Sequence, residues 1–346
     1  MCYRNSHSAD KGTTFFRHTP IFSTYFSKSQ LLFAHLIKKH YLCKKNNENM
    51  KRAITIKEQI AKLRNRGVVI SNEQKAEEVL LDIGYFRLCS YFFPFEESYP
   101  EYDDRTHQFV EGTTFEDAVA LYYFDFDLRH ILIRYISRIE VAFRTYLTYY
   151  VSNKYNEHPN WFVNEKIVST KYAKSFRNEV YTDKFKLNPV IKRHHQKYPG
   201  KYAPAWKTIE YMTFGAVLYL YCNLNNDDDK IAIAKQFNIK QVTTFSNYLE
   251  TLRVVRNACA HGNVLFDLRL PKSIRRGPAG KMTNENKYIL CGMLKVLYYM
   301  IGQVSTNRAK EMQENVQKAY KTLEEKAPNI YQQIVEITGY NALFID

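Results

Sequence analysis

A long apolar stripe between residues 115 and 153 limits the possible folds of this chain more than any other feature. Its members recur at steps of three or four residues: Leu128, Leu132, Tyr135, Ile139, Ala142, Tyr146 and Tyr150. This spacing places them on one face of a helix, and a continuous stripe of this kind is buried. Gly and Pro are scarce, at 12 and 10 of 346 residues, which favours long regular elements over loops. We therefore expect an all-α protein with one helix over 115–153.

Several charged side chains of this predicted helix lie off the stripe. They are Arg134, Arg138, Glu140 and Arg144. Glu140 and Arg144 stand four residues apart, the spacing of an ion pair along a helix surface, which is worth only a few tenths of a kcal/mol. We expect this pair to be a solvated bridge on a charged face.

A second predicted helix, from about residue 240, ends in an unusual set of polar side chains. Its apolar positions are Leu249, Leu252, Val255 and Cys259, and the residues that follow are Arg256 and Asn257 inside the helix and His261 and Gly262 at its end. Five residues of helix turn through about 500°, so the Arg256 and His261 side chains point about 140° apart on a straight helix. They converge only where the helix ends or distorts. Gly262 suits the left-handed conformation found just past a helix end.

The pair of Arg256 and His261 is suited to cleaving a phosphodiester bond. A guanidinium binds phosphate in a bidentate way, and an imidazole gives or takes a proton near neutral pH. The same spacing also fits a structural role, in which Arg256 pairs with a carboxylate and His261 caps carbonyl groups at the helix end. The spacing by itself leaves both interpretations open.

Charge and cysteine content indicate the partners and the compartment. The 50 basic and 35 acidic residues give a formal net charge of +15, which suits a polyanionic partner, nucleic acid before a membrane. The six cysteines show neither a zinc-site spacing nor a disulfide framework, so we expect reduced thiols in a cytoplasmic protein with no metal site. The longest uncharged apolar run, about residues 212–224, is too short to span a bilayer.

The chain divides into three predicted regions. Residues 1–49 have neither a sustained periodicity nor a signal-peptide pattern, so we expect them to be disordered or to precede the true start, which would be Met50. Residues 50–113 are expected to form a helical, aromatic-rich N-terminal extension, and residues 114–346 a helical bundle. Within the bundle we expect an unbroken apolar helix over Trp206–Leu224 and a buried helix over Asn286–Ile301.

A long irregular segment, residues 262–284, follows the motif. It carries four cations between Gly and Pro residues: Lys272, Arg275, Arg276 and Lys281. A loop of this length in a compact domain is usually functional or disordered. Beside the motif it would guide a phosphate backbone, and the alternative is a solvated flexible loop.

Four stretches in order, within about residues 55–335, resemble the Abi-like abortive infection proteins of bacteria. They are Asp82-Ile-Gly-Tyr-Phe-Arg-Leu-Cys-Ser-Tyr91 with Pro94-Phe95, Arg138-Ile-Glu-Val-Ala-Phe-Arg144, Pro204-Ala-Trp-Lys-Thr-Ile-Glu-Tyr-Met-Thr-Phe-Gly215 and Arg256-Asn-Ala-Cys-Ala-His261. The resemblance implies a fold of the HEPN superfamily, four-helix bundles whose Arg-x4-6-His motifs cleave RNA without a metal, two copies forming one site. It also implies that Glu140, Arg144 and Glu210 support that site.

From the motif and the resemblance together we expect a metal-independent RNA endonuclease that acts as a toxin in abortive infection. His261 would be the general acid or base, Arg256 would bind and stabilise the phosphorane, and Asn257 would have an orienting or hydrogen-bonding role. We expect no cofactor, a homodimer, and a phage trigger or an antitoxin as further partners. Two alternatives stay open: a non-catalytic HEPN-like module that binds RNA, a nucleotide or a protein, and a purely structural helical protein.

Overall fold

The computed structural model describes residues 52–343, and its longest element is α5 (Phe115–Lys154), a helix of 40 residues that spans about 60 Å. Thr114 begins α5 with a capping box: its hydroxyl accepts from the Asp117 N–H, and the Asp117 carboxylate accepts from the Thr114 N–H. The apolar stripe predicted for this helix is confirmed from Leu128 to Ala142, but Tyr146 and Tyr150 are only half-buried, and Phe143, Leu147 and Val151 are buried in their place.

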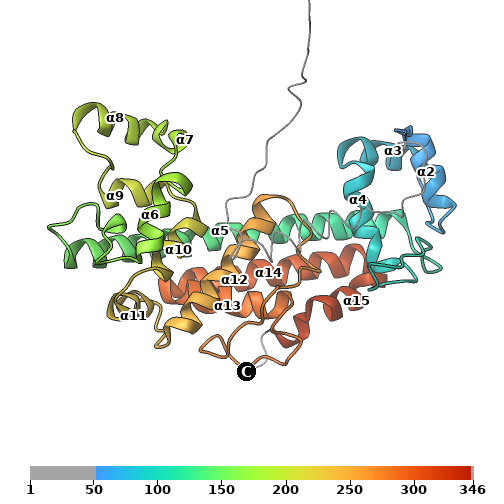
Figure 1. The fold of residues 1–346 in the computed structure, drawn as a ribbon. Coiled ribbons are helices and arrows are strands. Elements are labelled where there is room, and N and C mark those ends of the chain that lie inside the picture. Colours follow the sequence, from blue (N-terminus) through green and yellow to red (C-terminus); the bar gives the residue numbers. More distant parts are fainter. Residues whose placement is uncertain (1–51, 344–346) are drawn as a thin grey trace, which may run out of the picture. The chain divides into compact units, whose positions relative to one another are not determined.

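Three later helices pack along α5 and complete a helical bundle (Figure 1). They are α12 (Val242–Ala260), α13 (Leu290–Val304) and α14 (Thr306–Lys326). The remaining α-helices are α2 (Ile56–Arg64), α3 (Glu73–Asp82), α4 (Tyr85–Phe92), α6 (Thr170–Glu179), α7 (Asp183–Lys186), α8 (Pro189–Lys197), α9 (Ala205–Thr208), α10 (Phe214–Cys222), α11 (Asp227–Lys235) and α15 (Pro328–Thr338). Over residues 52–343 there are isolated β-bridges but no strand, so the all-α prediction is confirmed.

The helices α2, α3 and α4 lie near the N-terminal end of α5, where α4 packs directly on α5, α3 packs on α4, and α2 packs on α3 (Figure 1). The docking is aromatic, because the ring of Phe92 lies 5.4 Å from that of Phe109 and 6.0 Å from that of Phe115, centroid to centroid. An isolated bridge between Val69 and Thr114 ties the same region to the residue that caps α5. Residues from Ala53 onwards form one compact unit.

The helices α6 to α9 form a group of short helices at the other end of α5 (Figure 1). The unbroken helix predicted over Trp206–Leu224 is wrong there. The segment divides into α9, the 3-10 turn η3 (Ile209–Tyr211) and α10, because the Thr213 hydroxyl accepts from the Ala216 N–H and starts a new helix. The break leaves the carbonyl groups of Ile209 and Met212 to be satisfied by a side chain from α5.

The start predicted for α13 is also wrong, by four residues. Asn286–Ile289 stay outside the helix because the carbonyl groups of Lys287 and Tyr288 accept hydrogen bonds from the N–H groups of Ile274 and Leu270. That pairing fixes the end of the long irregular segment against the start of α13.

No helix between residues 52 and 343 is both long and apolar enough to span a bilayer. The prediction made for residues 1–49 lies outside the described residues. The division into an extension and a bundle at residue 114 stays a prediction.

Candidate functional site at the end of α12

The motif helix α12 ends in a regular C-terminal cap. Its last residue is Ala260, and Gly262 has the left-handed backbone expected of it, with φ +66°. The Asn263 N–H donates to the Ala258 carbonyl at 3.0 Å, and the Gly262 N–H donates to the Cys259 carbonyl at 3.3 Å. These two bonds define a Schellman cap, which satisfies carbonyl groups that the helix leaves unpaired.

The backbone keeps its helical hydrogen bonding up to His261, although α12 itself ends at Ala260. The His261 N–H still donates to the Asn257 carbonyl at 3.0 Å, as it would inside a helix. The Cα–Cβ bonds of Arg256 and His261 therefore leave the helix end in directions about 140° apart. The end of the helix does not turn the two side chains toward each other at their Cβ atoms.

Arg256 is anchored by a carboxylate while part of its guanidinium stays in solvent. Its Nε lies 3.8 Å from Oε2 of Glu140, its Nη1 donates to Oδ1 of Asn257 at 3.4 Å, and its side chain is 35% exposed. His261 is exposed, and its imidazole has neither a hydrogen bond nor an ion pair within the described part of the chain. The structural role considered for this pair had two parts. The pairing of Arg256 with a carboxylate is present, whereas the His261 ring does not cap the carbonyl groups at the helix end.

The solvated bridge predicted for Glu140 and Arg144 is wrong, because both side chains are largely buried, at 15% and 10% exposure. Nη2 of Arg144 donates to Oε1 of Glu140 at 2.8 Å, and Nη1 donates to the carbonyl groups of Ile209 and Met212. The break before α10 thus supplies the acceptors that make burial of a guanidinium acceptable. Glu140 uses one oxygen for Arg144 and presents the other to Arg256.

Glu210 makes no direct contact with the motif. It is exposed in η3 and lines a surface hollow with Arg144, but it makes no hydrogen bond or ion pair with Arg256 or with any other described residue. Arg144 and Glu140 are thus connected to Arg256 by direct contacts, and Glu210 only shares the hollow.

A buried cluster that the sequence reasoning missed holds the turn after His261. The Asp125 carboxylate accepts from the N–H groups of Leu265 and Phe266, from the Tyr91 hydroxyl at 2.9 Å, and from Arg129. Complete burial raises the pKa of Asp125 to about 6, and the Arg129 charge and the backbone donors oppose that rise.

Two guanidinium groups fix the backbone immediately after the motif. Arg129 donates to the Asn263 carbonyl at 3.3 Å, and Arg87 donates to the Gly262 carbonyl at 3.1 Å. The Asp82–Tyr91 stretch and the first half of α5 therefore position the residue next to His261.

The basic loop is tied to a different part of α12. The Asn247 side chain accepts from the Arg275 N–H at 2.7 Å and donates to the Ser273 carbonyl at 3.1 Å, and the Tyr248 hydroxyl accepts from the Ala279 N–H at 3.2 Å. Tyr248 precedes Arg256 by eight residues, or about 12 Å along a helix. All four loop cations (Lys272, Arg275, Arg276 and Lys281) are exposed. Within the described residues, Arg275, Arg276 and Lys281 make no hydrogen bond or ion pair with Arg256 or His261.

The residues around the motif offer neither a reactive thiol nor, within residues 52–343, a group of metal-binding side chains. Burial raises the pKa of the Cys259 thiol to about 12, so this thiol stays protonated and is a poor nucleophile. Within residues 52–343 no group of three or more His, Cys, Asp or Glu side chains is placed to hold a metal ion. What the helix end offers is an accessible imidazole for proton transfer and a held guanidinium for binding an anion.

Comparison with known proteins identifies a family. A family model described as Abi-like protein matches residues 78–267, more than half of the chain. The match begins in α3, includes all of α5, and ends six residues after His261. Neither a curated protein nor a solved structure matches the chain significantly. The extent of the match places this chain in the Abi-like protein family.

Proposed function

We propose that this protein is a metal-independent RNA endonuclease of the HEPN type that acts in abortive infection. Membership of the Abi-like family suggests the abortive-infection role. The ribonuclease activity rests on one observation above all: an accessible imidazole with no partner among residues 52–343 stands at the end of α12, one turn after a guanidinium that a largely buried carboxylate holds. A structural role for His261 would require a hydrogen bond or an ion pair to its ring, and none is present within the described residues.

The reaction follows from the chemistry of the two groups. The RNA 2′-hydroxyl attacks the adjacent phosphorus, forming the new P–O2′ bond while the P–O5′ bond breaks. An imidazole accepts the 2′-hydroxyl proton, and an imidazolium supplies a proton to the departing O5′. The products are a 2′,3′-cyclic phosphate and a free 5′-hydroxyl. Arg256 binds the non-bridging oxygens and stabilises the charge of the phosphorane, and Asn257 orients Arg256 through the bond at 3.4 Å.

A homodimer is part of the proposal because the side chains of Arg256 and His261 diverge within one chain. Two copies related by a two-fold axis would face each other through the ends of their α12 helices. A single groove would then hold two imidazoles, one for each proton transfer, and two guanidinium groups.

The test is cleavage of a labelled RNA by the full chain in excess EDTA, with Arg256→Ala and His261→Ala beside the unaltered protein. Arg64→Ala and His130→Ala, which change an exposed Arg on α2 and an exposed His on α5, are the matched controls. We expect cleavage by the unaltered protein and both controls, and a loss of about a hundredfold or more in the two motif variants. Equal cleavage by all five proteins would place the activity elsewhere. RNA binding without cleavage would indicate a non-catalytic module.

A further inference from the structure

Two large aromatic side chains are exposed to solvent at the end of α5 that carries the α6–α9 group. Trp206 in α9 is 56% exposed, and Tyr149 on α5 is 61% exposed. The Trp206 indole has neither a ring contact nor a hydrogen bond within residues 52–343, and Tyr149 has only an edge contact with Tyr150. Aromatic rings of this size are usually well buried, and an exposed cluster of them indicates a binding surface.

Both rings line one open hollow of about 490 Å³ between α5 and the α9–η3 segment. The hollow also has polar groups with no partner in the described chain, among them Thr148, Asn156 and Glu210. An apolar peptide or a membrane would leave these groups unsatisfied, at a cost in free energy. The lining therefore suits a flat ligand with hydrogen-bonding edges.

Arg144 links the hollow to the proposed site through one further side chain. Arg144 lines the hollow, and the same guanidinium donates to Glu140, whose second oxygen lies 3.8 Å from Nε of Arg256. Two side chains thus connect the floor of the hollow to the Arg that is proposed to bind the phosphate.

We propose that this hollow is a nucleobase subsite for single-stranded RNA, in which a guanine stacks on Trp206 and Tyr149 and presents its edge to Glu210. The inference rests on the proposed function, whose substrate it specifies. Aromatic side chains stack on unpaired bases, and sequence-specific proteins read the Watson–Crick edge of such bases. A carboxylate only accepts hydrogen bonds. Guanine offers it two adjacent donors, N1–H and N2–H, whereas adenine and cytosine offer one amino group beside an acceptor nitrogen.

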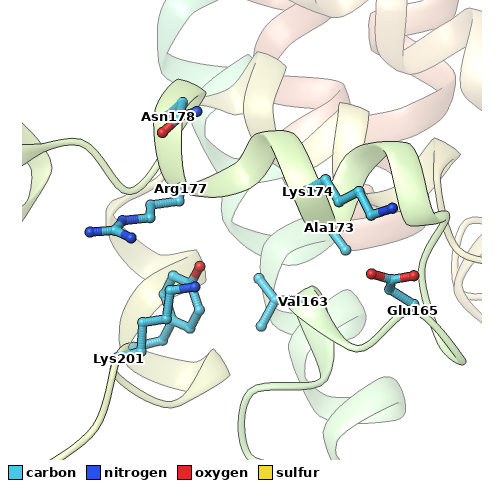
Figure 2. Close-up of a pocket in the computed structure, with 8 residues that line it drawn as sticks. Val163, Glu165, Ala173, Lys174, Arg177, Asn178 and Lys201 are labelled. Carbon is cyan, nitrogen blue, oxygen red and sulfur yellow. The ribbon is translucent and has the colours of Figure 1, made fainter.

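The phosphate backbone has a complementary surface next to this subsite. The Lys201–Glu210 segment lines two hollows, since Trp206 and Glu210 line the first and Lys201 the second, of about 470 Å³. Figure 2 shows Arg177 and Lys201 on one side of the second hollow and Lys174 with Glu165 on the other. Residues 165–201 contain ten Lys or Arg and three Asp or Glu, a formal excess of +7. Such a surface attracts phosphates while Glu210 repels them from the base subsite.

Tryptophan fluorescence tests the proposal directly. The chain has two Trp residues, and Trp161 is completely buried with its indole N–H bonded to Ser152, so a ligand on the surface reports through Trp206. The full chain carrying His261→Ala would be titrated with oligouridylates that contain one central guanine, adenine or cytosine. We expect quenching, with the guanine oligonucleotide bound most tightly. Tyr149→Ala should weaken binding by about tenfold or more, whereas Tyr123→Ala, the same change on an exposed Tyr of α5 26 positions earlier, should not.

The specificity has its own variant. Glu210→Gln replaces one acceptor oxygen by a donor, so it should remove the preference for guanine and keep the quenching. Absence of quenching, equal loss in Tyr149→Ala and Tyr123→Ala, or a guanine preference that survives Glu210→Gln would overturn the proposal. If the unaltered protein cleaves RNA and His261→Ala shows no quenching, the base subsite fails and the ribonuclease stands. If His261→Ala shows guanine-selective quenching and the unaltered protein cleaves nothing, the ribonuclease proposal fails and the base subsite stands.

Discussion

Glu140 forms an ion pair with Arg256, in which Oε2 of the carboxylate lies 3.8 Å from Nε of the guanidinium. The other oxygen of Glu140 is occupied by Arg144, which itself bonds two carbonyl groups of the broken segment before α10. A chain of contacts thus runs from the backbone of η3 to the guanidinium at the end of α12.

Glu140→Gln should weaken catalysis more than it weakens the fold. The amide keeps the shape and one acceptor for Arg144 but removes the charge that orients Arg256, so we expect kcat/KM for RNA cleavage to fall by about 10- to 100-fold. Glu250→Gln is the matched control, because Glu250 pairs with Arg253 on the same helix as the motif and has no contact with Arg256. Cleavage by Glu140→Gln at the unaltered rate would show that the contact is incidental.

Gly262→Ala should destabilise the protein by about 1–2 kcal/mol. The backbone at this position has φ +66°, and a Cβ would lie 3.1 Å from Nη1 of Arg87, the group that bonds the Gly262 carbonyl. Gly302→Ala in α13 is a control with the opposite expected sign, because its Cβ would meet only the Ala309 Cβ at 3.8 Å and Ala favours a helix interior. Urea unfolding of both variants checks the pair, and equal stability would contradict the assigned cap.

Asp125→Asn should destabilise the fold, and by more at pH 4 than at pH 7. Burial raises the pKa of Asp125 from 3.8 to about 6, so between these values the folded protein holds a proton that the unfolded chain releases. The stability that this proton contributes is complete below pH 3.8 and is lost as the pH rises through 6, which amounts to about 3 kcal/mol. Asn has no such proton. Urea unfolding at the two pH values measures the difference, and a larger effect at pH 7 would contradict the raised pKa.

Mixing two inactive proteins tests the shared groove. If two copies build one site, a dimer of an Arg256→Ala chain with a His261→Ala chain keeps one guanidinium and one imidazole. We expect mixtures refolded together to recover a measurable fraction of the cleavage that each variant alone lacks. A monomeric mass for the active protein in solution would count against this geometry, and so would a mixture no more active than its parts.

Much of the fold is predictable because its elements are long and periodic. The α5 helix runs for 40 residues, and the spacing of its apolar residues predicts the buried positions from Leu128 to Ala142. The break between Trp206 and Leu224 is less visible, since most of the segment is apolar and only the capping hydroxyl of Thr213 marks the start of α10.

The surroundings of the site are harder to predict, because they depend on contacts between distant segments. The Glu140–Arg144 spacing is typical of an exposed pair, and it is buried only because Arg144 finds carbonyl groups 65 and 68 residues later in the chain. Asp125 could have been found, since extending the Leu128 stripe backwards by one step of three places a carboxylate on the buried face. A charge at such a position indicates a buried partner.

The dependence of cleavage on the RNA 2′-hydroxyl is the most direct test of the proposed ribonuclease mechanism. One RNA sequence would be compared with the same sequence bearing a single 2′-deoxy nucleotide at the mapped cleavage position, and the ends of the products would be identified. We expect the unaltered protein to cut the RNA to a 2′,3′-cyclic phosphate and a 5′-hydroxyl, the deoxy position to resist cleavage, and His261→Ala to cut neither substrate. Cleavage at the deoxy position, or cyclic phosphate formed at the unaltered rate by His261→Ala, would contradict this mechanism.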